Sequence, residues 1–282
     1  MMLKDLRQIW GESGFRPVKR LGQNFLVDNN VKNNILEAFG LEAGRTVVEI
    51  GSGFGVMSFE AAVRCGKLVA VEKDKRIYSI MAPFFEKAGI ELILGDILDL
   101  DICRIAGGVE HILVFGNIPY YISTPIIEKV IEERSCIDVV YLVIQEEYAD
   151  RVISGPGSKT YGSISCYVQY YMRPKKLFKI SKNSFFPRPQ VDSCLVRFEM
   201  LPSPSVRTKD EKLMFSVIRR AFSQRRKKAV NPLSEGGFGT LTRSAWEKIF
   251  EECGISPSSR AEDLSLQNYA ALADVLAEKI EE

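Results

Sequence analysis

The chain has 282 residues, of which 46% are hydrophobic and 26% charged, and its formal net charge is +2. This is the composition of an ordinary globular protein, and the length allows one large or two modest domains with buried cores. No apolar run approaches the roughly 20 residues of a membrane span, and residues 1–15 lack the apolar core of a secretory signal. We therefore expect a cytoplasmic protein without a membrane segment.

Short apolar runs alternate with longer amphipathic segments from residue 46 onward. The apolar runs are rich in β-branched residues and too short for buried helices, which indicates interior strands. We predict these strands at 46–50, 67–72, 90–96, 111–116 and 137–145. Helical patterns lie between them at 56–64, 74–88 and 123–134. This alternation predicts an α/β fold with a parallel sheet that is covered on both faces.

Two further strands are predicted at 175–180 and 193–200, separated by a loop at 181–192. Because no helix lies between them, we expect an antiparallel pair that closes the edge of the sheet. The segment 201–210 is rich in Pro, Ser and charge, as linkers are.

Helical patterns follow this linker at 210–222, 242–253 and 265–280, and the last has amphipathic spacing. The chain is therefore predicted to hold two domains. The first, residues 1–206, contains the sheet, and the second, residues 207–282, is small and all-helical.

The six cysteines are scattered, with no C-x-x-C pair. This pattern predicts reduced thiols, most of them serving as small core residues. The one histidine, His111, lies just before an apolar strand, so we expect a structural or surface residue. A catalytic triad, a Cys-His pair or a multi-His metal site would depend on it. We therefore predict chemistry without a histidine base, and no metal site.

Basic residues concentrate in two runs, 171–188 and 219–228, each with six basic residues and no acidic one. Phe and Tyr residues are interleaved with them. A solvated helix face is one interpretation of such a run. Two runs in a nearly neutral protein favour a polyanion partner, because phosphate binding needs a directed basic patch.

Residues 49–55 read EIGSGFG, directly after a predicted strand. Gly51, Gly53 and Gly55 allow the backbone to turn tightly and to approach a ligand without a Cβ collision. The spacing is G-x-G-x-G and differs from the G-x-G-x-x-G of dinucleotide-binding proteins. Glycine turns are also common without a ligand, so this motif needs support from its neighbours.

Two acidic residues give that support. Glu72 ends the next strand, where a carboxylate can bind both ribose hydroxyls, and Asp96 ends the third, where it can accept from an adenine amino group. Helix N-capping is the alternative role for each. Because the carboxyl ends of parallel strands form the ligand-binding edge, these features favour a nucleoside-bearing cofactor. The glycine spacing points to S-adenosylmethionine, which has no pyrophosphate for a helix terminus to hold.

The fourth strand delivers Asn117, Ile118, Pro119 and Tyr120 to the same edge. The exocyclic amine of adenine is a poor nucleophile, because its lone pair is delocalised into the ring. The Asn117 amide oxygen and the Ile118 carbonyl, in a turn constrained by Pro119, can each accept one N–H and aim the lone pair at a methyl group. Tyr120 offers a flat face for the base. A structural turn that closes the strand is the alternative.

These residues belong to a wider resemblance. From about residue 17 to its end, the chain resembles the bacterial small-subunit (16S) ribosomal RNA adenine N6,N6-dimethyltransferases. Eight ordered blocks carry the resemblance: LGQNFLVD (21–28), EIGSGFG (49–55), Glu72 in VEKD, GD (95–96), FGNIPYYISTPI (115–126), GPGSKTYGSIS (155–165), FFPRPQVDS (185–193) and AFSQRRKKAVNPL (221–233).

The resemblance implies a Rossmann-like S-adenosylmethionine-dependent methyltransferase sheet followed by a small helical RNA-recognition domain. The implied cofactor shell consists of Asn24, Leu26, Gly51, Gly53, Glu72, Asp96 and Asn117. The implied catalytic set is Asn117, Ile118, Pro119, Tyr120 and Phe186, with Phe186 stacking on the target base and Phe185 as the alternative. We expect RNA contacts from Arg225, Arg226, Lys227 and Lys228.

The resemblance also implies a substrate. The family dimethylates two neighbouring adenosines in the hairpin loop near the 3′ end of small-subunit rRNA, within an immature 30S particle, and we expect a monomer. Ser52 stands where Pro or Ala is frequent in the family, and Ile118 where Leu is usual. NIPY is also frequent in the macrolide-resistance adenine methyltransferases of large-subunit rRNA, which are the nearest alternative. A non-catalytic RNA-binding factor on the same fold and a DNA adenine methyltransferase are the other two.

Overall fold

The computed structural model describes residues 3–18, 21–236, 238 and 241–281. The chain divides into two compact units. The first comprises Met1–Ala149 and Lys175–Met200, and the second comprises Asp150–Pro174 and Leu201–Glu282.

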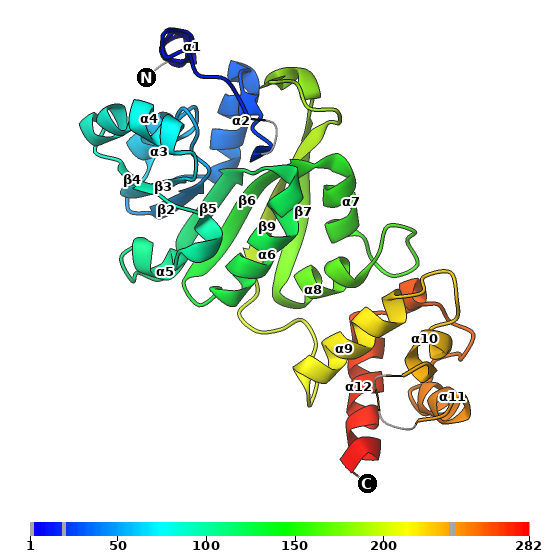
Figure 1. Ribbon diagram of the computed structural model, residues 1–282. Coiled ribbons are helices and arrows are strands. Elements are labelled where there is room, and N and C mark those ends of the chain that lie inside the picture. The colour runs from blue at the N-terminus through cyan, green and yellow to red at the C-terminus, as the bar shows by residue number, and fades with distance from the viewer. Residues whose placement is uncertain (1–2, 19–20, 237, 239–240, 282) are drawn as a thin grey trace. The chain divides into compact units, whose positions relative to one another are not determined.

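The first unit is built on a seven-stranded sheet with the order β4-β3-β2-β5-β6-β9-β7 (Figure 1). Its strands are β2 (Thr46–Ile50), β3 (Lys67–Glu72), β4 (Glu91–Leu94), β5 (Ile112–Asn117), β6 (Ile137–Gln145), β7 (Met172–Ile180) and β9 (Ser193–Met200). Strands β2 to β6 pair in parallel, and β9 runs antiparallel to β6. The five predicted parallel strands are confirmed, and β9 and β7 are neighbours at the sheet edge as expected.

Three helices between the strands confirm the predicted segments: α3 (Ser58–Arg64), α4 (Lys75–Lys87) and α6 (Ser123–Glu132). Four others were not predicted: α1 (Leu3–Glu12), α2 (Asn29–Phe39), α5 (Ile102–Ile105) and α7 (Glu146–Ile153), the last of which runs on into the second unit. On one face of the sheet, Val47 and Phe115 share a core with Ile35 of α2 and Met81 of α4. Successive strand residues point to opposite faces, and Val48 is as fully buried as Val47. Both faces are therefore covered, as in other parallel sheets.

A two-stranded sheet was not predicted. β1 (Phe25–Leu26) pairs antiparallel with β8 (Phe185–Phe186), with Phe25 opposite Phe186. Strand β8 lies inside the predicted loop 181–192. Neither strand was recognised in the sequence, because two residues are too few to show an alternating pattern. The pairing joins two of the blocks that are far apart in the sequence.

The second unit is helical. Its helices are α8 (Ser163–Tyr171), α9 (Glu211–Phe222), α10 (Val230–Ser234), α11 (Arg243–Glu252) and α12 (Leu266–Glu281). Tyr167 and Tyr170 of α8 pack edge-on against Phe215 of α9, with ring centroids 5.2 and 5.1 Å apart. These contacts correct the predicted boundary between residues 206 and 207. The segment 150–174 belongs to the helical unit, because the aromatic face of α8 is buried there.

Cys103 and Cys136 form a disulfide, so the prediction that all the thiols are reduced is wrong for this pair. The two residues are 33 positions apart, and their pairing follows from the fold rather than from a local motif. Cys166 and Cys194 are buried and outside the disulfide, as expected for core thiols.

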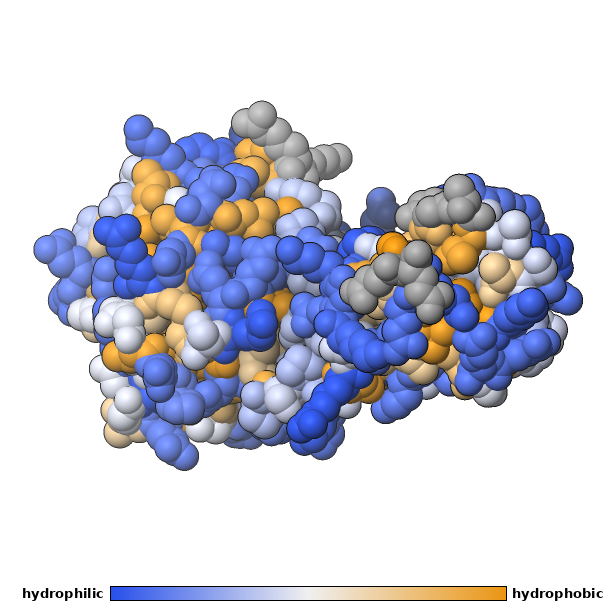
Figure 2. Space-filling model, turned by 90° about the horizontal axis from the view of Figure 1, so that it is seen from below, coloured by the Kyte–Doolittle hydropathy of each residue, from blue (hydrophilic) through white to orange (hydrophobic). Residues whose placement is uncertain are grey.

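His111 is exposed where β5 begins, and its Nδ1 lies 2.7 Å from Asp138 Oδ1, so it is a surface residue as predicted. Among the helices that the structure describes, none has the length and apolarity that crossing a membrane requires. The surface in Figure 2 is mainly hydrophilic, with apolar residues in scattered patches.

Candidate active site at the carboxyl edge of the sheet

One pocket lies where β2, β3, β4 and β5 end. Its lining includes every residue predicted for the cofactor and the whole Asn117–Tyr120 stretch: Asn24, Leu26, Gly51, Gly53, Glu72, Asp96, Asn117, Ile118, Pro119 and Tyr120. Phe186 is not among the lining residues. The β-α-β rhythm thus brings four predicted motifs to one edge, and the N-terminal block joins them.

The Glu72 carboxylate shapes the glycine turn. It accepts hydrogen bonds from the backbone N–H of Gly53 (2.8 Å) and of Asp74 (2.7 Å), and it is buried. Burial raises its pKa, against the lowering effect of these bonds. The N-cap of α4 is Asp74, so the capping alternative for Glu72 is wrong. Gly53 has a φ of +54°, and a Cβ there would lie 3.1 Å from the Phe25 ring, which explains the need for glycine.

Asp96 has a structural bond as well as a place in the pocket. Strand β4 ends at Leu94, and Asp96 caps the following 3₁₀ turn by accepting from the Leu98 N–H at 3.1 Å. Its other carboxylate oxygen pairs with Lys73, which also lines the pocket. The capping alternative is therefore correct for Asp96, although this role uses only one of its two oxygens.

The Asn117 amide is oriented by the N-terminal segment. Its Nδ2 donates to the Asn24 carbonyl at 2.8 Å, which leaves Oδ1 as the acceptor of this side chain. Gly22 lies close by with a φ of +60°, and a Cβ there would come within 3.0 Å of the Pro119 Cβ. The turn at Gly22 therefore packs closely on the Asn117–Tyr120 stretch.

Aromatic side chains surround this stretch. The Tyr120 hydroxyl shares a hydrogen bond of 2.7 Å with Ser193, and burial raises its pKa. Tyr121 lines the pocket and is 58% exposed. Phe186 is 55% exposed, whereas Phe185 is buried in the core, so Phe186 is the one of the pair that is available to a ligand.

Trp10 connects α1 to the glycine turn and was not predicted. Its ring stacks on Phe54 at 5.2 Å and meets Phe25 and Phe186 edge-on at 4.8 and 5.3 Å. Its indole N–H donates to the Phe15 carbonyl at 3.1 Å. The segment before the first block thus supports the pocket through a cluster of aromatic rings.

Glu49 is a further residue that the sequence analysis missed, although it lies in the quoted EIGSGFG turn. It lines the pocket, is fully buried and bonds to the Ser58 hydroxyl. Burial raises its pKa from 4.5 to about 8. Ser52, which also lines the pocket, has a buried hydroxyl oxygen without a hydrogen-bond partner. An acid and an unpaired hydroxyl in the lining fit a ligand with amino and polar groups, as S-adenosylmethionine has.

Glu49 should make the protein less stable as the pH rises. Its pKa is about 8 in the folded chain and 4.5 ordinarily, so between these values the folded state keeps a proton that the unfolded state loses. Each pH unit of increase in this range therefore lowers the free energy of unfolding by up to about 1.4 kcal/mol. We expect Glu49→Gln to remove most of this decline when denaturant unfolding is measured from pH 5 to 8. Glu37→Gln, at an exposed site of α2, should leave it unchanged.

The basic run at 171–188 is partly neutralised in the folded chain, through two of its six basic residues. Glu146 pairs with Lys176 (3.2 Å) and Lys179 (2.8 Å), and Asp192 pairs with Lys179 (2.9 Å). These lysines lower the pKa of both carboxyls. Both acids lie outside the run, so its free positive charge is smaller than the sequence indicated.

In the second run, Arg225 is bound within its own unit. Its Nη2 donates to the carbonyls of Lys159 (2.8 Å) and Tyr161 (2.7 Å) and lies 3.2 Å from a Glu262 oxygen. Arg225 therefore holds the loop before α8 in place, a structural role that the sequence analysis did not foresee.

Known proteins are similar to this chain in sequence. The model of the ribosomal RNA adenine dimethylase family matches residues 14–278. A protein of Pelotomaculum thermopropionicum named ribosomal RNA small subunit methyltransferase A is 39% identical over 95% of this chain and 94% of its own. The protein of that name in Alkaliphilus oremlandii is 36% identical, with 98% of each chain covered.

Two solved structures have the same fold. A dimethyladenosine transferase from Plasmodium falciparum superposes with a TM-score of 0.75 at 21% identity, over 88% of this chain and 95% of that one. The 23S rRNA methyltransferase ErmE gives 0.68 at 21% identity, over 92% and 100%. The match to the family model over almost the whole length, together with relatives well above 30% identity, means that this chain belongs to the ribosomal RNA adenine dimethylase family.

Proposed function

We propose that this protein uses S-adenosylmethionine to dimethylate N6 of two adjacent adenosines in the 3′-terminal hairpin loop of small-subunit rRNA. The observation that carries the proposal is the orientation of the Asn117 amide. Its Nδ2 donates to the Asn24 carbonyl, so the Asn117 Oδ1 is left as an acceptor. Gly53, Glu72 and Asp96 line the same pocket. The names of the relatives support small-subunit rRNA as the substrate.

Some of the proposed site residues would bind the cofactor, and others would position the target adenine. Glu72, Asp96 and the glycine turn would hold the cofactor, which supplies an electrophilic methyl group when bound. Asn117 Oδ1 and the Ile118 carbonyl would each accept one N–H of the target amine and so direct its lone pair. Tyr120 would stack on the base, together with Phe186, which is exposed and not part of the pocket lining. The amine gains a methyl group and loses a proton to solvent, so no histidine base is required.

We also propose that the enzyme acts as a monomer in the cytoplasm, on rRNA within an immature 30S particle. An adenosine in a hairpin loop is more easily unstacked than one in a duplex, which suits a pocket that must enclose the base. The helical unit would recognise RNA through the basic residues near the end of α9.

The alternatives differ in substrate or in activity. The likeness to ErmE is one of fold and leaves large-subunit rRNA as the second candidate substrate. A non-catalytic RNA-binding factor would have no need for Glu72, Asp96 and Asn117 in one pocket, which favours an enzyme.

Methylation in vitro tests the proposal. Small subunits, large subunits and duplex DNA, each lacking the modification, would be incubated with the protein and labelled cofactor, and the modified nucleotides mapped by mass spectrometry. We expect two dimethyladenosines near the 3′ end of small-subunit rRNA. Label on large subunits or DNA alone would contradict the proposed substrate, and no label on any of them would favour the binding factor.

RNA binding should depend on Arg226 and Lys228, which are exposed near the end of α9. We expect Arg226→Gln with Lys228→Gln to weaken RNA binding and to reduce the slope of log affinity against log salt by roughly 0.7–0.9 per lost contact. Arg225 is left intact because its loss would disturb the loop that it holds. Lys248→Gln, at an exposed site of α11, is the matched control. An unchanged slope in the double variant would mean that these residues only face solvent.

A further inference from the structure

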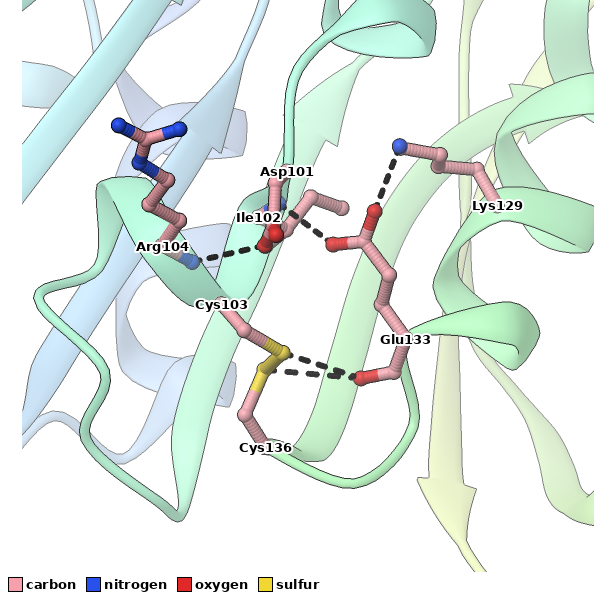
Figure 3. Close-up of a disulfide and its surroundings, with 7 residues drawn as sticks. All are labelled: Asp101, Ile102, Cys103, Arg104, Lys129, Glu133 and Cys136. Carbon is pink, nitrogen blue, oxygen red and sulfur yellow. Dashed lines mark hydrogen bonds and ion pairs between the residues drawn. A yellow bond between two sulfur atoms is a disulfide. The ribbon is translucent and has the colours of Figure 1, made fainter.

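A second group of reactive side chains lies at the opposite edge of the sheet, where β5 and β6 begin. Cys103 of α5 and Cys136, just before β6, form the disulfide, with Asp101 and Glu133 next to them (Figure 3). One ligand atom each of Asp101, Cys103 and Glu133 lie within 4.8 Å of one another. The four side chains come from two segments that the fold brings together.

This group is suited to a reduced state as well as to the disulfide. Both sulfur atoms lie 3.5 Å from the Glu133 carbonyl oxygen, where two thiols would find an acceptor. The Cα atoms of Cys103 and Cys136 are 5.8 Å apart. In a tetrahedral zinc site, two Zn–S bonds of about 2.3 Å place the sulfurs about 3.8 Å apart. Two thiolates at this Cα separation can therefore reach one ion.

The two carboxylates are held near Cys103 by hydrogen bonds and an ion pair. Glu133 accepts from the Ile102 backbone N–H and pairs with Lys129, as Figure 3 shows. Asp101 accepts from the Arg104 N–H at 2.8 Å. Hydrogen bonds of this kind fix the direction of metal-binding carboxylates, and Lys129 would offset part of their negative charge.

We propose that the reduced form of this group binds a thiophilic divalent cation of the zinc class through Cys103, Cys136, Asp101 and Glu133. Reduction by a dithiol converts the S–S bond into two thiols and the dithiol into its own disulfide. Cation binding then releases both thiol protons. The bound ion would link α5 to the segment between α6 and β6, as the disulfide does. The site lies away from the pocket, so it has no part in methyl transfer.

Cobalt(II) binding tests this proposal in the full-length protein. The chain is reduced with a phosphine, freed of reductant and titrated with Co²⁺, which absorbs strongly in the near ultraviolet when bound by thiolates. We expect one equivalent of bound cobalt in the reduced chain and no such band in the oxidised chain. Zn²⁺ should displace the cobalt and raise the unfolding temperature of the reduced chain.

Variants identify the ligands. Cys103→Ser should abolish the band, whereas Cys65→Ser, at a free and partly buried cysteine, should retain it. Asp101→Asn and Glu133→Gln should each weaken cobalt binding at least about tenfold. A reduced wild-type chain without the band, or a Cys103→Ser variant that keeps it, would overturn the proposal. Unchanged affinity in both carboxylate variants would overturn the four-ligand set.

Discussion

Asn117→Ala is expected to lower the rate of methyl transfer to undermethylated small subunits by about two to three orders of magnitude. That is the usual loss when one preorganised hydrogen bond to a reacting group is removed. The Asn117 oxygen is one of the two acceptors proposed for the target amine, and the Ile118 carbonyl alone cannot fix the direction of its lone pair. The measurement is the initial rate with labelled S-adenosylmethionine at saturating cofactor, which separates catalysis from cofactor binding.

Two further variants sharpen this test. Asn117→Asp keeps an acceptor oxygen but loses the N–H donated to the Asn24 carbonyl and sets a carboxylate against it, so it should also be impaired. Asn34→Ala, at an exposed site of α2, should retain the full rate. A normal rate for Asn117→Ala would remove Asn117 from the proposed mechanism, and rescue by excess cofactor would reduce its role to cofactor binding.

Glu72→Gln is expected to weaken S-adenosylmethionine binding by at least about tenfold and to destabilise the fold by about 1–3 kcal/mol. The carboxylate accepts from two backbone N–H groups, those of Gly53 and Asp74. In the amide, one of these N–H groups would face an NH₂ group and lose its partner. The same change would remove an acceptor proposed for the ribose hydroxyls. Calorimetric titration with cofactor and denaturant unfolding measure the two effects separately.

Glu91→Gln, on the surface of the neighbouring strand β4, is the control and should change neither quantity appreciably. Loss of stability with normal cofactor affinity would mean that Glu72 only supports the glycine turn. The reverse result, weaker cofactor binding in a chain of normal stability, would mean that Glu72 acts only by binding the cofactor.

The position of the pocket was predictable from the sequence, because its signals are local. The strands before Gly51, Glu72, Asp96 and Asn117 are short runs rich in β-branched residues, and the segments between them have helical periodicity. A parallel sheet then brings the carboxyl ends of all four strands to one edge. The glycine turn, Glu72, Asp96 and the N-I-P-Y stretch could therefore be assigned to one site from their places in the chain, whereas Asn24 and Leu26 were implied only by the family resemblance.

The partners of individual side chains could not be predicted in this way. Nothing near Asn117 in the sequence indicates that the Asn24 carbonyl orients its amide. The charge of the 171–188 run depends on Glu146 and Asp192, which lie on other elements. Glu49 was overlooked because a carboxyl becomes unusual only when it is buried, and its burial results from packing.

The β-α-β order, the site motifs and the edge of the sheet at which they meet follow from local signals, because periodicity and turn residues act over a few positions. The pairing of β1 with β8, the place of residues 150–174 in the helical unit and the disulfide between Cys103 and Cys136 follow from long-range contacts in the folded chain. Each of these depends on one or two residues whose partners lie far away in the chain. The free energy of such contacts comes from burial and pairing in the folded state, and it leaves no periodic pattern in the sequence.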